Sequence, residues 1–394
     1  MRTRMLKFRL YPNKTQRQVL EQTLEDCRQV HNYLLASQKA IYEETENLVS
    51  QYDQNIELTQ LKRENPTLSK VHSQVLQNIS KRVRDAYHNF FVRRKLGLKA
   101  GLPRFKKYGR YKSITYPQSG FKIKGKKLLL SKIGAINIKL HRPIKGNVKT
   151  LTVKRMPSGK WFAVFSCKIH FESEEKPNGT VGIDVGLNHF AVLSDGQIVE
   201  NPQNYRKSER KLARVQRQFS RKKRKSRNRE KARIKVARLH EKVSNQRNDF
   251  LHKFSRKIAF SYSTIFVEDL QIPNMLQNHK LAKSIADASW GRFIQMLSYK
   301  AEEAGGKVVK VDPKDTTQIC SRCGLKVPKA LSERIHICPR CGLTMDRDLN
   351  ASRNILLKNT VGTAGIHACE NRTSTPVKEQ VWLLKQEASQ LVER

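Results

Sequence analysis

Apolar and polar residues alternate at the start of the chain and again in its middle third. In the opening stretch "MRTRMLKFRLYP", every second residue from Leu6 to Leu10 is apolar and those between are basic, as in a half-buried strand. Four more alternating runs, separated by glycines, follow within residues 121–171. We predict a small antiparallel β-barrel made of residues 101–172 and completed by a first strand at residues 1–12.

Apolar residues at helical spacing occupy the segment between these β parts. We predict a helical domain at residues 13–100, whose first helix has Thr15 as its N-cap. The second helix is expected at residues 69–96 because one apolar stripe runs along it. Five polar residues lie beside that stripe, either as an ordinary solvated face or as contacts to a ligand: Gln74, Gln77, Asn78, Arg82 and Arg84.

A second domain follows a linker at residues 173–180. Its first stretch, "VGIDVGLNHFAVLSDG", predicts two short apolar strands joined by a tight turn, and "TIFVEDLQI" predicts another buried strand. A helix, a strand and a final helix come after it, so we predict an α/β domain at residues 181–357. Asp184 interrupts the first strand and Glu268 ends the later one, which is unfavourable for buried strands.

The chain is far more basic than solubility requires. It has 78 Lys and Arg against 34 Asp and Glu among 394 residues, a formal charge of +44. Such a chain repels itself unless a polyanion neutralises it, and contacts to phosphates gain free energy by releasing counterions. Nucleic acid is therefore the expected partner, with a solvated basic surface or an anionic membrane as the alternatives.

Two segments concentrate the basic residues. Residues 206–235 hold sixteen Lys or Arg, and the flanking apolar stripes predict a helical hairpin at residues 205–258 rather than a disordered tail. Its tip offers four candidate nucleic-acid contacts: Arg221, Lys222, Lys223 and Arg224. The stretch "GLPRFKKYGRY" mixes basic and aromatic residues, which suits phosphate contacts and base stacking, and its candidates are Arg104, Lys106 and Lys107.

No run of about 18 apolar residues occurs and the first residues lack the apolar core of a secretory signal. We therefore expect an intracellular protein with reduced thiols and no membrane partner.

The cysteines predict a metal site. Two Cys-x2-Cys pairs, each followed by glycine, predict a structural Zn²⁺ finger at residues 316–344 rather than two redox pairs. The four ligands are Cys320, Cys323, Cys338 and Cys341.

Three carboxylates have one common explanation. Asp184 lies in an apolar strand, Glu268 ends another, and Asp348 starts a helix in "TMDRDLNASRNILL". A carboxylate in a buried strand is unfavourable unless it is paired or binds a metal ion. We predict a two-ion Mg²⁺ site, in which one ion activates water and the other stabilises the leaving 3′ oxygen of a phosphodiester.

The order of the motifs resembles that of the TnpB family, nucleases encoded by bacterial insertion sequences and related to type V CRISPR effectors. The resemblance rests on "GIDVGLNHFAVLSDG", "IFVEDLQIPNM", the cysteine finger and "DRDLNASRNI", preceded by "RLYPNKTQR", "SQVLQN" and "GLPRFKK". It covers residues 1–357. The remaining tail, residues 358–394, has no clear pattern, and we expect it to be disordered.

The resemblance implies an RNase H-like RuvC nuclease domain with a zinc ribbon inserted before its last helix, and a WED-like barrel interrupted by a helical recognition domain. It matches Asp184, Glu268 and Asp348 to the catalytic triad, with Asp346 as the weaker candidate. It also implies a monomer in the bacterial cytoplasm that binds guide RNA from the transposon end and double-stranded target DNA. A short motif beside the target would be read by Ser73, Gln74, Gln77 and Asn78.

The expected function is therefore RNA-guided cleavage of DNA. Two alternatives stay open: a transposase that joins DNA strands, and a DNA-binding accessory protein of transposition that does not cut. Three carboxylates have no use in a protein that only binds, which argues against the second. RNase H-like folds serve both cutting and joining, so a guide RNA retained by the purified protein is the observation that separates the readings.

Overall fold

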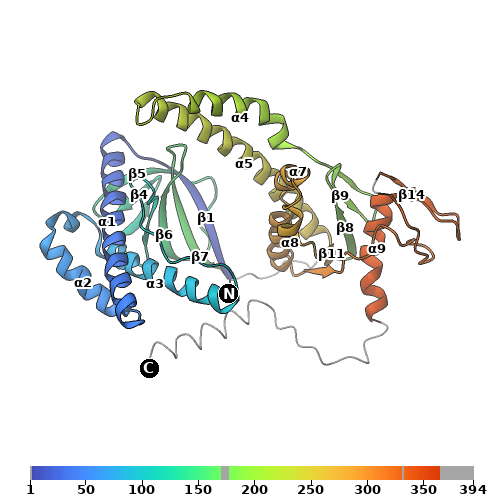
Figure 1. Cartoon of the computed structure of the whole chain (residues 1–394), viewed down its shortest axis with the longest axis horizontal. Coiled ribbons are helices and arrows are strands. Elements are labelled where there is room, and N and C mark those ends of the chain that lie inside the picture. Colours follow the sequence, from blue (N-terminus) through green and yellow to red (C-terminus); the bar gives the residue numbers. More distant parts are fainter. Residues whose placement is uncertain (1, 170–176, 331, 364–394) are drawn as a thin grey trace. The chain divides into compact units, whose positions relative to one another are not determined.

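The computed structural model describes residues 2–169, 177–330 and 332–363. The described residues form two compact units, one that ends at residue 169 and one that begins at residue 177 (Figure 1). Each unit is built around one large sheet, so the chain has a mixed α/β fold, in agreement with the sequence. None of the described helices combines the length and the apolar character that crossing a membrane requires.

The first unit contains a seven-stranded antiparallel sheet that curls into a near-barrel. Its two edges are β2 (Ser113–Tyr116) and β3 (Phe121–Lys124), although these strands directly follow one another in the chain. The edges therefore meet, and the hydroxyl of Tyr116 donates a 3.3 Å hydrogen bond to the carbonyl of Ser131. Between the edges lie, in order, β6 (Asn147–Arg155), β7 (Trp161–Ile169), β1 (Arg2–Tyr11), β5 (Gly134–Lys139) and β4 (Lys127–Leu130).

β1 is the central strand of this sheet. It pairs antiparallel with β5 on one side and with β7 on the other. Leu6, Phe8 and Leu10 are buried, as their alternation with basic residues predicts. The ring of Phe8 packs 5.9 Å from that of Phe165 on β7. The first strand of the chain thus forms the middle of a sheet whose other strands all come after residue 112.

Helices of the first unit correct two details of the sequence prediction. The N-cap of the first helix is Asn13 rather than Thr15, because Asn13 and Gln16 exchange hydrogen bonds of 2.8 and 3.1 Å in a capping box. The second predicted helix begins at Ser73 rather than at residue 69, because a 3-10 turn and an extended Val71 come first. The elements are α1 (Lys14–Thr45), α2 (Gln51–Glu64), η1 (Pro66–Lys70) and α3 (Ser73–Lys95).

The second unit is built on a five-stranded mixed sheet. Its central strand, β8 (Thr180–Val185), pairs antiparallel with β9 (His189–Leu193) and parallel with β11 (Thr264–Glu268). The outer strands are β10 (Ile198–Glu200), beside β9, and β12 (Lys307–Val311), parallel to β11. The carboxyl ends of β8 and β11, where two of the candidate carboxylates lie, are therefore at the same edge.

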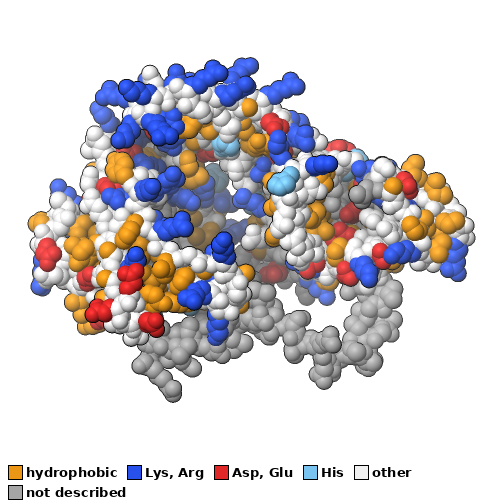
Figure 2. Space-filling view, viewed as in Figure 1, with side chains coloured by type: hydrophobic (Ala, Val, Ile, Leu, Met, Phe, Trp, Pro, Cys, Tyr) orange, Lys and Arg blue, Asp and Glu red, His pale blue; other side chains and the backbone are white. Residues whose placement is uncertain are grey.

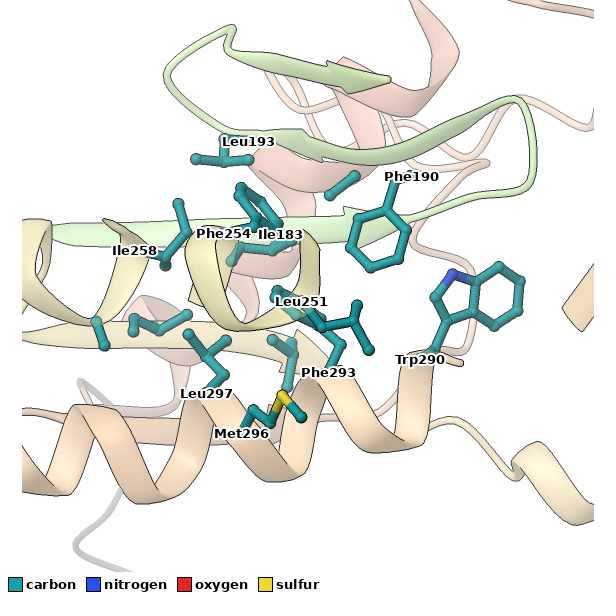
Figure 3. Packing of buried hydrophobic residues seen from close by; sticks show 14 of the residues in the cluster. Ile183, Phe190, Leu193, Leu251, Phe254, Ile258, Trp290, Phe293, Met296 and Leu297 are labelled. Carbon is teal, nitrogen blue, oxygen red and sulfur yellow. The ribbon is translucent and has the colours of Figure 1, made fainter. Parts of the chain in front are cut away.

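Different helices cover the two faces of this sheet. On one face, α5 (Arg227–Ser261) and α8 (Trp290–Glu303) bury the main core (Figure 3). The ring of Phe254 on α5 stacks on that of Phe293 on α8, with centroids 5.1 Å apart. On the opposite face, α9 (Arg347–Thr363) packs against the sheet through Ile355.

The remaining elements of the second unit are a long helical hairpin, two short helices and a small β-hairpin. The helical hairpin consists of α4 (Asn204–Ser220) and α5, and the short elements are α6 (Ile272–Met275), α7 (Ala282–Ala288), β13 (Ile335–Ile337) and β14 (Thr344–Asp346). α9 continues to Thr363, so the predicted tail boundary at residue 358 is six residues too early. Residues 364–394, on which the prediction of disorder falls, lie outside the described residues.

Candidate active site and nucleic-acid surfaces

Two of the candidate carboxylates project from the same face of the second sheet. Side chains alternate along a strand, so Asp184 shares the face of Gly182 and Glu268 shares the face of Phe266. Phe266 packs against α9, on the face opposite to the main core. The parallel pairing of β8 and β11 is in register up to Val267, which sets Glu268 beside Asp184. The apolar neighbours of Asp184 therefore serve the core while Asp184 itself faces α9.

α9 brings Asp348 to the same place. A Cβ atom at Gly182 would lie 2.1 Å from the carbonyl oxygen of Ser352, so glycine is what allows α9 to lie directly on β8. Asp348 is four residues before Ser352, on the same side of the helix and about 6 Å along its axis. Asp184 is two residues beyond Gly182, about 6.6 Å along the strand. The charge of Asp348 raises the pKa of Asp184, so we infer that α9 runs opposite to β8 and that these matching offsets put the two carboxylates near each other.

Gly182→Ala is expected to separate the helix from the sheet. Because the added methyl group meets backbone atoms, α9 must move, at a cost of about 1–3 kcal/mol in the free energy of unfolding. The cleavage rate should fall by more than the loss of folded protein explains, since Asp348 moves with α9. Chemical denaturation measures the first effect and a DNA cleavage assay the second. Gly101→Ala is the stability control, because a Cβ there meets no atom within 4 Å; equal behaviour of the two variants would contradict the packing argument.

The carboxylates differ in their partners. Burial, and then the neighbouring charges of Glu268 and Asp348, raise the pKa of Asp184 to about 8. No hydrogen bond or ion pair to the Asp184 carboxylate occurs within the described part of the chain. Burial also raises the pKa of Glu268, although a hydrogen bond from Thr316 acts in the opposite direction. Asp348 pairs with Arg347 at 3.2 Å. Asp184 is thus a half-buried acid on which two neighbouring carboxylates act, while the charge of Arg347 opposes them.

Asp184 should make the metal-free protein less stable as the pH rises. Its pKa is about 8 when folded and about 3.9 when unfolded, so the folded state retains a proton that the unfolded chain releases between these values. Asparagine imitates the protonated form of Asp184. The free energy of unfolding of Asp184→Asn should therefore exceed that of the wild type by at least ~1 kcal/mol at pH 9 in the presence of EDTA. At pH 4 the two should be equal. Urea unfolding at both pH values measures the difference, and a constant difference would contradict the assignment.

Asp346 has a structural task beside these acids. Its Oδ1 accepts hydrogen bonds from the backbone N–H groups of Asp348 and Leu349, at 2.8 and 3.0 Å. It therefore caps the first turn of α9, as expected for an acid at a helix N-terminus. Its charge also helps to raise the pKa of Asp184, which shows that it lies near the site. Asp346 stays the weaker candidate for a metal ligand.

The four predicted cysteine ligands come together. The Sγ atoms of Cys320 and Cys341 are 3.6 Å apart and those of Cys323 and Cys338 are 3.5 Å apart. A tetrahedral Zn²⁺ ion with Zn–S bonds of 2.3 Å separates its sulfur atoms by about 3.8 Å, so the arrangement fits zinc. Within the described ranges, these thiols are the only group of three or more candidate metal ligands whose ligand atoms all lie within 4.8 Å of one another.

Two matching turns build the cysteine cluster. In each, the glycine after the second cysteine has a positive φ, +76° at Gly324 and +66° at Gly342, and donates its N–H to the carbonyl of the first cysteine. This geometry explains why glycine follows each pair in the sequence. His336 is fully buried within the finger, contacts Lys329, and is not part of the cysteine group.

The predicted contacts on α3 are in two different states. Gln77 is exposed and faces solvent in the isolated chain. The other three have hydrogen bonds within the first unit: Ser73 from Lys62, Gln74 from the backbone of Ser119, and Asn78 from Arg82. Among these four side chains, Gln77 is therefore the one that is exposed without such a hydrogen bond, whereas the other three are fixed by contacts within the unit.

An exposed basic and aromatic loop lies on α1. Asn32 exchanges two hydrogen bonds with the backbone of Lys106, at 2.8 and 3.0 Å, and Arg28 donates a third to the Lys106 carbonyl. With its backbone held, the loop turns its side chains outward, and Phe105 and Tyr108 are 53% and 83% exposed. We call this segment, residues 104–108, the anchored loop. Its three predicted contacts are all exposed: Arg104, Lys106 and Lys107.

The tip of the α4–α5 hairpin is the second basic surface. Figure 2 shows Lys and Arg side chains crowded along this hairpin. The turn is fixed by Arg229, which lies over the ring of Phe219 at 4.4 Å and donates a 2.7 Å hydrogen bond to the carbonyl of Lys222. The four predicted contacts at the tip are exposed: Arg221, Lys222, Lys223 and Arg224.

Models of protein families match three parts of the chain. Residues 148–279 match OrfB_IS605, described as "Probable transposase", and residues 290–355 match a Cas12f1-like TNB domain. Residues 1–47 match a model of a helix-turn-helix domain, although they form β1 and one uninterrupted helix.

Whole-chain comparisons find relatives of similar length. A Streptomyces pristinaespiralis protein named "Putative RNA-guided DNA endonuclease" is 34% identical, over 92% of this chain and 90% of its own. The Escherichia coli protein with the same name and the addition InsQ is 33% identical, over 90% and 92%. The chain also resembles the cryo-EM structure of a Cas12f1–sgRNA–target DNA complex, with a TM-score of 0.56 and 14% identity, over 88% of this chain and 83% of that one. This last likeness concerns the fold.

Proposed function

The chain belongs to the TnpB family of RNA-guided DNA endonucleases, and on that premise we propose that it cuts double-stranded DNA selected by a guide RNA. The relatives at 33–34% identity over nine tenths of the chain favour an endonuclease over a non-cleaving accessory protein. The observation that carries the proposal is the convergence of Asp184, Glu268 and Asp348 from two parallel strands and a helix.

The chemistry is metal-dependent phosphodiester hydrolysis in a RuvC-type, RNase H-like domain. Bound Mg²⁺ ions would supply the activation of water and the stabilisation of the leaving 3′ oxygen. Asp184 fits as the central ligand, because it is half-buried beside two other carboxylates and makes no hydrogen bond or ion pair through its carboxylate within the described residues. Glu268 accepts a hydrogen bond from the hydroxyl of Thr316, and Asp348 forms an ion pair with Arg347. The four cysteines fit a structural zinc ribbon beside this site.

The basic surfaces would hold the two nucleic acids. The tip of the α4–α5 hairpin offers charge for phosphates, and the anchored loop adds aromatic rings on which bases can stack. On α3, Gln77 is the freely exposed candidate for reading a short motif beside the target. We further propose that the guide comes from the transposon end, as the family resemblance implies.

The anchored loop gives a direct test of the nucleic-acid surface. Replacing Phe105 and Tyr108 together by alanine should weaken guide RNA binding at least ~10-fold, because stacking on one aromatic ring contributes about 1–3 kcal/mol. Tyr52→Ala is the matched control, since Tyr52 is also exposed, at 74%, but lies on α2, outside the anchored loop. Filter binding at fixed salt measures the affinities. Equal affinity of the double variant and the wild type would remove this loop from the interface.

Co-purification tests the proposed RNA partner. The protein is expressed with the DNA that flanks its gene, purified, and any bound RNA is sequenced. We expect one major RNA species that maps to the transposon end. Protein that carries no discrete RNA but joins DNA strands would favour the transposase reading instead.

A further inference from the structure

A chain of buried hydrogen bonds links the carboxylate of Glu268 to the cysteine finger. The hydroxyl of Thr316 donates a 2.6 Å hydrogen bond to Oε1 of Glu268. Thr316 is 2% exposed and Glu268 is 9% exposed, so water does not compete for this bond. Thr316 lies four residues before the first cysteine of the finger. The segment that holds Glu268 is therefore the one that enters the finger.

Two asparagines fasten this segment to α9. The side-chain amide of Asn354 donates to the carbonyls of Thr316 and Ile319, at 2.8 and 2.6 Å. The Asn350 side chain donates to the Ile319 carbonyl at 2.7 Å and accepts from the N–H of Ser321, the residue after Cys320, at 2.9 Å. Four residues apart, the two asparagines share one side of α9. Both are buried, so these polar groups depend on each other for hydrogen bonds.

The arrangement makes the finger part of the support of the active site. α9 carries Asp348 at its start, and its asparagines hold the segment with Thr316 and Cys320. If the finger unfolds, the segment from Thr316 to Ser321 loses its hydrogen bonds to α9. Glu268 then loses the hydrogen bond from Thr316 that fixes its side chain. Groups that orient a metal-binding carboxylate typically change metal affinity 10–100-fold when they are removed.

We propose that Thr316, Asn350 and Asn354 are positioning residues through which the zinc-filled finger fixes Glu268 and Asp348 for divalent-ion binding. The proposal rests on the proposed function, because it assumes that the carboxylates bind such ions. It assigns the finger a role in the affinity of the active site for its metal, in addition to any role in stability or in contacts with nucleic acid.

Thr316→Val tests the first link, because valine keeps the shape of threonine and removes only the hydroxyl. The probe is Mn²⁺, and the zinc-loaded full chain, free of RNA, is titrated while electron paramagnetic resonance measures the free ion. We expect Mn²⁺ binding to weaken at least ~10-fold, with zinc content and guide RNA affinity unchanged, and Thr316→Ser to restore it. The matched control is Thr317→Val, at an exposed neighbouring position. Mn²⁺ affinity of Thr316→Val equal to that of the control overturns the proposal.

A double-variant cycle tests the link to the finger. Cys323→Ser should weaken Mn²⁺ binding in the wild-type background and have much less effect when Thr316 is already valine, because both changes release the same carboxylate. Additive effects would overturn the coupling even if each variant alone binds weakly. Asp184→Asn distinguishes failure of the proposed function from failure of the positioning role. If the wild type binds Mn²⁺ no better than Asp184→Asn, the carboxylate site and the proposed function fail together; if it does bind better, only the positioning role is at stake.

Discussion

Asp184→Asn is expected to reduce DNA cleavage by at least ~1000-fold while guide RNA binding stays within about twofold of the wild type. Asparagine has nearly the same shape, but it lacks the charge that a divalent ion requires. The loss should be this large because the charges of both Glu268 and Asp348 act on Asp184, so the three carboxylates are expected to share the bound ions. Cleavage of a matched duplex in Mg²⁺, followed on a denaturing gel, measures the effect.

Asp249→Asn is the matched control for this variant. Asp249 is an exposed acid of the same unit, on α5, with an ordinary surface ion pair to Lys253 at 2.8 Å. Such pairs contribute little to stability, so this variant should cleave like the wild type. Residual cleavage by Asp184→Asn above a tenth of the wild-type rate would mean that another acid performs its role. Loss of RNA binding would mean that Asp184 acts through the fold.

Cys320→Ser should have the second largest effect. Cys320 is 1% exposed, and its Sγ lies 3.6 Å from that of Cys341, so serine cannot replace it as a zinc ligand without loss. We expect the zinc content to fall from one ion per chain to near zero, with a loss of several degrees in the melting temperature, and cleavage to fall with it because the finger adjoins α9. Metal analysis and calorimetry measure these changes.

Cys167→Ser supplies the comparison for the zinc experiment. Cys167 is a fully buried thiol on β7, outside the finger. Its replacement should lower the melting temperature through poorer packing alone, with the zinc content unchanged. If Cys320→Ser keeps a full complement of zinc, the four-cysteine site is wrong. If it loses zinc but cuts DNA normally, the link from the finger to the active site is wrong.

Local spacing explains why much of the candidate site could be found in the sequence. Two Cys-x2-Cys pairs define their turns without outside help, and the four thiols do meet. Asp184 is conspicuous because a charge in an apolar strand needs a reason, and the face toward α9 provides it. The alternation around Phe8 likewise predicts a strand that is buried on one side only.

Contacts between distant segments are the part that the sequence leaves open. The sequence shows Gly182 only as a small residue in an apolar strand. The structure shows that α9 lies directly on it. Asn350 and Asn354 have helical spacing, but the carbonyls they bind belong to a segment more than 30 residues earlier. Asn32 and the anchored loop are 74 residues apart. The N-cap at Asn13 is a local feature, and it could have been identified from Gln16 three residues later.

Reconstituted cleavage is the measurement that tests the central claim most directly. The purified protein with its bound RNA is given Mg²⁺ and duplex DNA that matches the end of that RNA, beside a randomised flank. We expect cutting of matched duplexes with one preferred flank, no cutting of unmatched duplexes, and no cutting by Asp184→Asn. Cutting that ignores the RNA sequence, or that continues in Asp184→Asn, would contradict it.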